Sequence, residues 1–188
     1  MNGRVINSDL VSALLPDSCQ LTLDQNTAYP SLFLSEENRK VTCVSQHQPY
    51  PAHPERFTSY YQVMCREALS GRCYWEVERG CTCVDIAVSY RDISRSGGYS
   101  HFGDNDKACI LRCSTDGYKF IHNSVYTAVT GPKSSRVGVY LDHKAGTLSF
   151  FSVVSDTVTL LHRVQKTFTQ TVYPGLGCYD NSAEILKL

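Results

Sequence analysis

The sequence has no excess of charge of either sign. Eighteen basic and eighteen acidic side chains give a formal net charge of zero at pH 7. A general binder of nucleic acid or of an anionic membrane carries a positive field, and this composition does not supply one. We therefore expect neither nucleic acid nor a membrane among the partners of this chain.

Long apolar runs are also missing. No segment approaches the roughly 20 consecutive apolar residues that a membrane-spanning helix needs. Residues 1–18 contain Asp9 and Asp17 and lack the continuous apolar core of a secretory signal peptide. With Met1 taken as the native start, these absences predict a cytoplasmic protein.

The sequence signatures of catalysis are missing as well. The chain contains no Gly-x-Ser-x-Gly elbow, no phosphate-binding loop and no dinucleotide fingerprint. Glu76 and Glu78 share one strand face, as a pair of glycosidase carboxylates could. Because they alternate with apolar residues on a half-buried strand, we expect both to face solvent. The sequence therefore predicts a protein that is not an enzyme and uses no cofactor.

Cysteine, in contrast, is abundant, with nine residues. Their spread through apolar, strand-like segments favours small reduced core residues, with a disulfide framework as the alternative. Two pairs, together with a histidine of the segment 46–55, could suggest zinc. The pairs are Cys81 with Cys83 and Cys109 with Cys113. Their spacing matches none of the common zinc knuckles, and strand alternation already explains it, so we expect no metal site.

The stretch 70–90 shows the alternation of two half-buried strands joined by a tight connection at Arg79 and Gly80. Trp75 is the only tryptophan and falls on the same face as Val77. That face is predicted to be buried. Strand alternation here and further along the chain yields the predicted core: Trp75, Val77, Ile86, Val88, Val137, Val139, Leu141, Leu148 and Phe150.

The other segments alternate between short apolar runs and polar loops. Residues 7–15 begin with good helix-capping residues, place Leu10 and Leu14 on one face and stop at Pro16, so they predict a short helix that packs on the domain. Further strands are expected at 32–34, 40–44, 107–113, 118–121, 160–164, 173–176 and 185–188, with a hairpin over 136–153 that turns at 142–146. Irregular loops are expected at 46–55, 91–105 and 132–135.

Two motifs give the chain a family resemblance. Residues 70–78, Ser-Gly-Arg-Cys-Tyr-Trp-Glu-Val-Glu, resemble the opening motif of a SPRY domain. Residues 137–150 resemble its second motif, Val-Gly-x-x-Leu-Asp-x-x-x-Gly-x-Leu-Ser-Phe. Upstream, Leu-Asp at 23–24 and Leu-x-Leu-Ser at 32–35 resemble a PRY element, which directly precedes SPRY domains. The details are most similar to the C-terminal PRY-SPRY modules of fish tripartite-motif and NOD-like-receptor proteins.

The resemblance implies the domain organisation and the fold. It divides the chain into an N-terminal extension with a short helix at 1–20, a PRY segment at 21–69 and a SPRY segment at 70–188, with 21–188 forming one compact domain. The implied fold is all-β, an antiparallel two-sheet sandwich of the lectin-like jelly-roll kind flanked by the helix. Many relatives carry a second tryptophan where this chain has Ala108 and Cys109, so we expect different core packing there. A monomer is expected for the isolated domain.

The resemblance also implies a function, the recognition of a protein partner without catalysis. In tripartite-motif proteins such a module selects the target, while a separate RING domain supplies ubiquitin ligase activity. An innate-immune role would follow from the resemblance alone. Two alternatives remain open, a glycan-binding, lectin-like module and the C-terminal module of a fish pore-forming toxin.

Four loops carry the tyrosine, arginine and other polar side chains that are favoured at protein interfaces. In SPRY modules such loops converge on one rim, which implies that they bind the partner here. The predicted partner-binding residues are Tyr50, His53, Arg56, Arg91, Arg95, Tyr99, His101, Arg112, Asp116, Tyr118, Tyr179, Asp180 and Asn181. We expect replacement of Arg112 or Tyr179 by alanine to weaken partner binding and to leave stability nearly unchanged.

Overall fold

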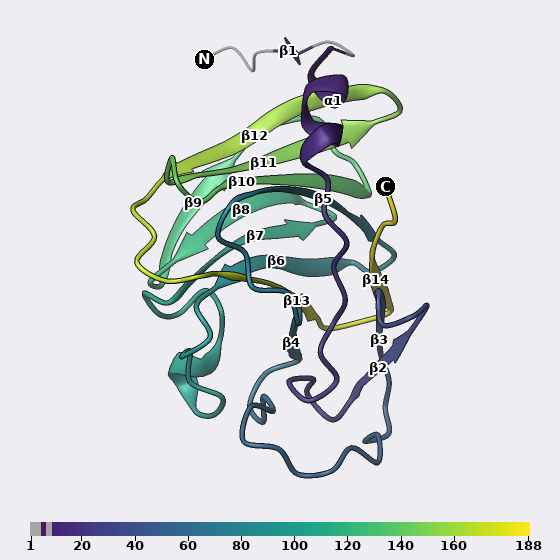
Figure 1. Ribbon diagram of the computed structural model, residues 1–188. Coiled ribbons are helices and arrows are strands. Elements are labelled where there is room, and N and C mark those ends of the chain that lie inside the picture. The colour runs from purple at the N-terminus through teal and green to yellow at the C-terminus, as the bar shows by residue number, and fades with distance from the viewer. Residues whose placement is uncertain (1–4, 7–8) are drawn as a thin grey trace.

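The fold is a sandwich of two antiparallel sheets, as predicted (Figure 1). The computed structural model describes residues 5–6 and 9–188. Outside the strands, this part of the chain contains one α-helix, α1 (Asp9–Leu14), and two 3-10 turns, η1 (Leu15–Asp17) and η2 (Gly98–Ser100). The first two residues of the predicted helix, 7 and 8, lie outside the described residues.

The larger sheet has eight strands in the order β1-β12-β11-β10-β5-β14-β3-β2. Their bounds are β1 (Val5–Ile6), β12 (Thr157–Gln165), β11 (Thr147–Val154), β10 (Arg136–Asp142), β5 (Arg72–Arg79), β14 (Ser182–Ile185), β3 (Lys40–Cys43) and β2 (Leu32–Ser35). The last strand was predicted at 185–188 and is observed as β14, at 182–185. It begins earlier because the chain turns at Asn181, where φ is +45°, and pairs with β3 and β5 directly after this turn.

The smaller sheet has six strands in the order β4-β13-β6-β7-β8-β9. Their bounds are β4 (Gln62–Met64), β13 (Tyr173–Cys178), β6 (Cys83–Ser89), β7 (Ala108–Ser114), β8 (Gly117–His122) and β9 (Val125–Val129). Sequence patterning missed β9, an edge strand whose first four residues are exposed. It follows a tight turn at Asn123 and Ser124, both with positive φ, which is the backbone conformation that two-residue hairpins require.

The two strands of the stretch 70–90 belong to different sheets. β5 pairs with β10 and β14, whereas β6 pairs with β13 and β7. The short connection at residues 80–82 therefore crosses the sandwich, and the adjacent strands do not form a hairpin. Trp75 lies opposite Val139, and Val77 lies opposite Val137. All nine predicted core residues are buried between the two sheets, and truncation of a core tryptophan to alanine costs roughly 3–5 kcal/mol.

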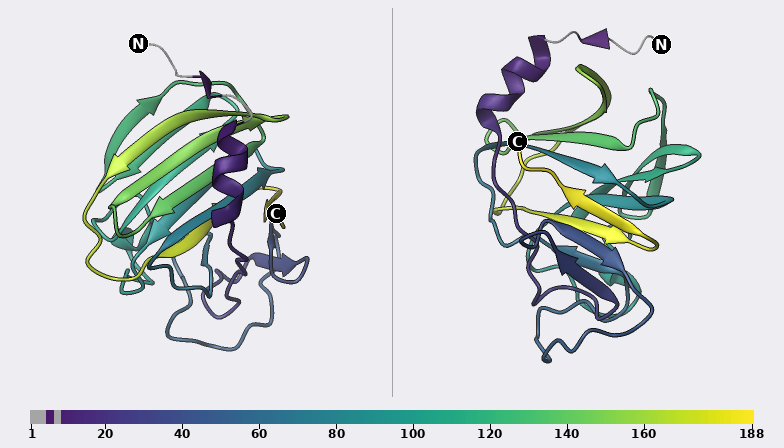
Figure 2. Two further views of the ribbon diagram at one scale, coloured as in Figure 1. Left: turned by 45° about the horizontal axis from the view of Figure 1, so that its top comes forward. Right: turned by 90° about the vertical axis from the view of Figure 1, so that its right-hand side faces the viewer.

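The outer face of the larger sheet is covered by the chain's own N-terminal segment. Helix α1 lies across the strands on this face (Figure 2). Its Leu14 packs in a cluster with Tyr74 and Phe151, as well as two valines. The expectation that Glu76 faces solvent was therefore wrong, because Glu76 is 4% exposed and accepts a hydrogen bond from the Tyr74 hydroxyl at 2.8 Å. Glu78, at the end of β5, is only partly buried.

The Tyr74 side chain also explains a glycine of the second motif. A Cβ atom on Gly138 would lie 2.6 Å from the Tyr74 hydroxyl oxygen. Glycine at this position of β10 therefore makes room for the tyrosine ring on the neighbouring strand. This packing ties the first motif to the second across the sheet.

A disulfide joins Cys19 to Cys73, with the two Cα atoms 5.6 Å apart. It attaches the segment after α1 to β5, where Cys19 N also donates to the Tyr74 carbonyl at 3.1 Å. The interpretation of all nine cysteines as reduced was wrong for this pair. The other seven, all within the described part of the chain, are free thiols. The two partners lie 54 residues apart in the sequence, so only the folded chain brings them together.

Candidate functional site

A buried carboxylate lies at the centre of the outer face of the smaller sheet. On β6, Val84 and Ile86 point into the core, so Asp85 between them points outward. On β7 the same alternation turns Arg112 to this face, because Leu111 and Cys113 are core residues. The two strands are neighbours, with Asp85 directly opposite Arg112.

Three side chains bind the Asp85 carboxylate. Arg112 forms a two-pronged ion pair, with Nε 2.7 Å from Oδ1 and Nη2 2.8 Å from Oδ2. The Tyr179 hydroxyl donates to Oδ2 at 2.9 Å. His101 Nε2 lies 3.3 Å from the same oxygen and 3.0 Å from the tyrosine oxygen. The Asp85 side chain is fully buried, and hydrogen bonds to a planar guanidinium are among the strongest available to it.

Burial and charge act in opposite directions on this cluster. Burial by itself would raise the pKa of Asp85, but Arg112 and His101 outweigh it and hold the pKa below the ordinary value. The hydrogen bond to Asp85 is the main reason that the pKa of Arg112 is raised. Burial, followed by the charge of Asp85, raises the pKa of Tyr179. The arrangement is therefore an ion pair with a neutral tyrosine.

A shallow pocket of about 260 Å³ opens above this ion pair. We call it the tyrosine pocket. Its lining residues are Tyr60, His101, Asp104, Arg112, Tyr126 and Tyr179. The Tyr60 ring meets the His101 ring edge-on, with centroids 5.0 Å apart. The pocket offers aromatic surface, one partly exposed carboxylate and a paired guanidinium.

Three residues of the tyrosine pocket were not predicted from the sequence. Tyr60 comes from the segment before β4, Asp104 from the 91–105 loop and Tyr126 from β9. Tyr126 is 57% exposed, and an exposed tyrosine in an edge strand would have been a usable signal once β9 was recognised. The other two carry no local signal that separates them from ordinary loop residues.

Of the thirteen predicted partner-binding residues, three line the tyrosine pocket: His101, Arg112 and Tyr179. Arg112 and Tyr179 are bound to a fully buried carboxylate. The expectation that alanine at these positions leaves stability nearly unchanged therefore conflicts with the structure. His101 is itself buried, with 6% of its surface exposed.

Two other predicted residues brace the 91–105 loop. Arg91 forms an ion pair with Glu55, its Nε 2.7 Å from Oε1, and its guanidinium lies over the Tyr173 ring. Arg95 donates to the Arg91 carbonyl at 2.7 Å and stacks on the Phe57 ring. These contacts hold the loop to the rest of the domain. Tyr99, on η2 of the same loop, is 78% exposed.

The predicted residues of the 46–55 loop and its end are also largely engaged in internal contacts. Arg56 is 6% exposed and donates to the carbonyls of Gln25 and Ala28, each at 2.8 Å. The Tyr50 hydroxyl donates to the Leu32 carbonyl at 2.7 Å. His53 Nδ1 accepts from the backbone of Glu55. Both this loop and the 91–105 loop lie at the lower end of the view in Figure 1.

The remaining predicted residues lie at the other end of the smaller sheet. β7 begins next to the 91–105 loop, where the Asn105 side chain accepts a hydrogen bond from Ala108 N. At its opposite end, β7 leads into the turn that holds Asp116. The backbone of that turn bonds to Thr82, and Thr82 in turn bonds to Asp180. Asn181 forms the next turn. Tyr118 is buried, and its hydroxyl donates to the Pro132 carbonyl. The thirteen residues therefore do not form one surface.

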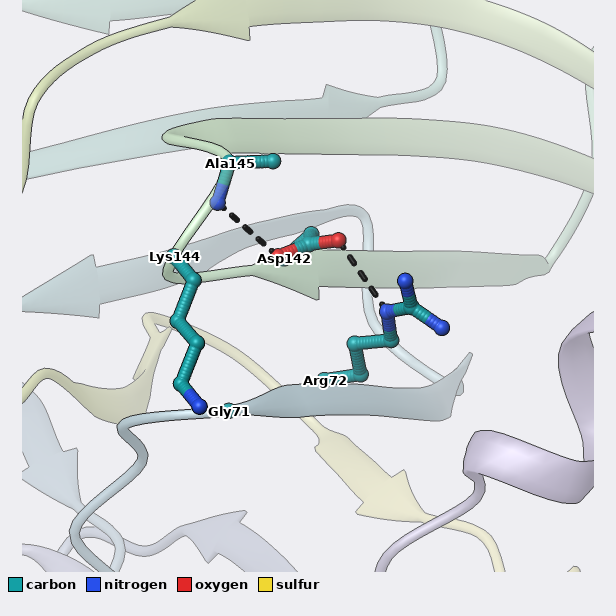
Figure 3. Close-up of a pocket in the computed structure, with 5 residues that line it drawn as sticks. All are labelled: Gly71, Arg72, Asp142, Lys144 and Ala145. Carbon is teal, nitrogen blue, oxygen red and sulfur yellow. Dashed lines mark hydrogen bonds and ion pairs between the residues drawn. The ribbon is translucent and has the colours of Figure 1, made fainter.

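A second hollow, of about 580 Å³, lies at the β10–β11 hairpin and contains none of the predicted residues (Figure 3). Its Asp142 carboxylate accepts from the backbone N–H of Ala145 at 3.0 Å and pairs with Arg72 Nε at 3.1 Å. The arginine side chain is 64% exposed, so this pair contributes little to stability. Lys144 reaches toward Gly71 in the same hollow. It is a polar surface depression without the buried support found beneath the tyrosine pocket.

Among residues 5–6 and 9–188, no cluster of three or more His, Cys, Asp or Glu side chains could hold a metal ion. Within the same residues, no helix has the length and apolar character needed to cross a membrane.

Family models establish the class of protein. The model described as "SPRY domain" matches residues 72–187, and the one described as "SPRY-associated domain", or PRY, matches residues 21–69. The chain therefore belongs to the SPRY family and carries a PRY segment directly before the SPRY domain. This confirms the family predicted from the two sequence motifs. Domains of this family are generally non-catalytic modules that bind protein partners.

Individual relatives belong to two groups. Stonustoxin subunit beta of Synanceia horrida is 44% identical over 172 residues, which cover 89% of this chain and 24% of that protein. Tripartite motif-containing protein 16 of Mus musculus is 30% identical over 177 residues, covering 91% and 32%. The crystal structure of the TRIM65 PSpry domain has the same fold, with a TM-score of 0.86 at 24% identity over 95% of this chain and 96% of that one. The chain thus spans a third or less of the length of these two sequence relatives.

Proposed function

We propose that this domain recognises a protein partner and that the tyrosine pocket is the centre of the contact surface. The observation that supports this most is the combination of partly or largely exposed aromatic rings with a rigid polar base. Tyrosine and arginine are enriched at binding hot spots, and the Asp85 ion pair fixes Arg112 and Tyr179 from beneath. Preformed side chains lose little conformational freedom on binding.

We further propose that the domain selects the target of a larger, cytoplasmic protein. That protein would be a tripartite-motif-type ubiquitin ligase or an innate-immune receptor, and the similarity to tripartite motif-containing protein 16 supports the tripartite-motif part of this proposal. In that setting the ligase chemistry belongs to another domain, and this domain acts as a monomer that contributes recognition alone.

The test is affinity capture from native tissue extract with the full-length protein as bait, followed by mass spectrometry. We expect a protein that is retained by the wild type and lost with Tyr126→Ala. Tyr99→Ala is the matched control, because Tyr99 is even more exposed but does not line the tyrosine pocket. A captured protein that binds both variants equally would refute the pocket as the contact surface.

Two observations favour a second candidate, the C-terminal module of a fish pore-forming toxin. Identity to stonustoxin subunit beta, at 44%, exceeds the 30% identity to the tripartite-motif protein. The disulfide between Cys19 and Cys73 also fits an oxidising compartment better than the cytosol. Addition of the full-length protein to erythrocytes separates the two candidates. Release of haemoglobin supports the toxin, and its absence at concentrations at which the protein still captures a partner supports target selection.

A further inference from the structure

The tyrosine pocket has mainly aromatic walls. Tyr60, Tyr126 and Tyr179 line it from three separate segments of the chain. The face of an aromatic ring carries partial negative charge and attracts cations that lie over it. The structure already shows this contact once, because the Arg112 guanidinium lies 5.9 Å from the centre of the Tyr179 ring.

Apart from His101, which lies between Asp85 and Asp104, the charged side chains of the pocket are two carboxylates and one guanidinium. The positive charge of Arg112 is matched by Asp85, which forms the two-pronged ion pair beneath it. Among the described residues that line the pocket, Arg112 is the only lysine or arginine. Asp104 then contributes the remaining carboxylate, with a side chain that is 30% exposed. Its Oδ2 lies 3.2 Å from His101 Nδ1, and its Oδ1 accepts from the Ser124 hydroxyl at 3.4 Å.

The tyrosine pocket is unsuitable for an anionic ligand. Arg112 directs both Nε and Nη2 at Asp85, so its two-pronged face is not available to a phosphate or carboxylate. Asp104 would repel a second negative group. Lys119 is exposed on the neighbouring strand opposite Arg112, but it does not line the pocket.

We propose that the tyrosine pocket receives a basic side chain, lysine or arginine, from the protein partner. The cation would lie against the faces of Tyr60 and Tyr126, with its charge matched by Asp104. The volume of about 260 Å³ is below the range of pockets for drug-sized ligands and suits one long side chain. This inference rests on the proposed function and states the chemistry that the partner must present.

The test uses four capped tripeptides, N-acetyl-Gly-X-Gly-amide, with X as arginine, lysine, citrulline or glutamate. Citrulline has the shape of arginine without its charge. Titration of the 188-residue chain, followed by amide NMR shifts around Asp104 and Tyr126, measures the affinities. We expect the arginine and lysine peptides to bind about fivefold or more tightly than the citrulline peptide. Equal binding of arginine and citrulline, tighter binding of glutamate, or no binding of any peptide overturns the proposal.

Two matched carboxylate variants test the role of charge. We expect Asp104→Asn to weaken binding of the arginine peptide by about fivefold. Asp106→Asn removes an exposed carboxylate two residues away that does not line the pocket, and it should leave the affinity unchanged. An equal effect of the two variants overturns the proposal. Thermal unfolding of both confirms that the fold is retained, and Tyr126→Ala replaces Asp104→Asn if the latter does not fold.

The same variants separate the two proposals in partner capture. In one outcome, Tyr126→Ala abolishes capture, Asp104→Asn does not, and the citrulline peptide binds as tightly as the arginine peptide. This result supports the pocket as the contact surface and refutes the proposal of a basic side chain. If the arginine peptide binds as expected while capture survives both variants, the cation site is supported and the proposed contact surface is refuted.

Discussion

The two outer faces of the sandwich hold the same arrangement of side chains and use it differently. On the larger sheet, buried Glu76 accepts from the Tyr74 hydroxyl at 2.8 Å and lies 3.7 Å from Arg136. On the smaller sheet, Asp85 accepts from the Tyr179 hydroxyl at 2.9 Å and pairs with Arg112 at 2.7 Å.

The difference lies in what covers each carboxylate. Helix α1 closes the first face, so that Tyr74 is fully buried. Part of the second face is also covered, because Phe57 and Phe102 pack in a buried cluster with Ile110. Among the described residues no α-helix lies over Asp85, and Tyr60 and Tyr126 stand partly or largely exposed around it. A buried carboxylate held by tyrosine and arginine can therefore serve either as internal support or as the base of an accessible surface. The cover decides which of these it becomes.

The largest expected effect is a difference in stability between alanine variants of the two arginines, Arg112 and Arg136. Arg112→Ala leaves the fully buried Asp85 without its cation, and removal of one member of a buried pair costs roughly 3–5 kcal/mol. Arg136→Ala should cost only about 1 kcal/mol, because the Arg136 side chain is 44% exposed and its contact to Glu76 is longer. Urea unfolding of both variants measures the difference, and equal losses would show that the two carboxylates are supported alike.

A smaller effect tests the cover on the larger sheet. Leu14→Ala should destabilise the domain by about 2 kcal/mol, the low end for a buried leucine, because a helix at the surface can settle into the space. Leu15→Ala is the matched control, since Leu15 is 41% exposed, and its effect should stay within about 0.5 kcal/mol. If unfolding experiments give equal values, α1 does not contribute to the fold through Leu14.

The smallest effect concerns pH. The pKa of Asp85 is lower in the folded state than in the unfolded chain, so its contribution is present above the unfolded value of about 4 and is lost as pH falls toward the folded value. Melting temperature should therefore fall with acidification below about pH 4, and less steeply in Asp85→Asn than in the wild type. Identical slopes of melting temperature against pH in the two proteins would show that Asp85 does not contribute to the acid sensitivity of the domain.

The fold was largely predictable because the alternation of apolar and polar residues is a local property of each strand. The strands around Trp75 and Val139 carry the period of a half-buried sheet, and the paired motifs at 70–78 and 137–150 lie on adjacent strands β5 and β10. Prediction failed where another part of the chain changes the environment of a residue. Glu76 has the sequence pattern of a solvent-facing residue, and it is buried because α1 and its neighbours cover that face.

The candidate site was predictable only in part, for the same reason. His101, Arg112 and Tyr179 were among the predicted residues, but Asp85, which holds them together, was not. An aspartate in an apolar strand shows only that it points away from the core. Its arginine is 27 residues away and its tyrosine 94, and no local pattern connects them.

By itself, the sequence determined the class of fold, the family and the identity of the core, because each follows from residue types at fixed spacing along single strands. Only the tertiary structure decided what covers each outer face, which cysteines form a disulfide and which polar side chains gather around Asp85. Those outcomes depend on contacts between segments that are distant in the chain. Such contacts are set by the packing of the two sheets and leave no periodic trace in the sequence.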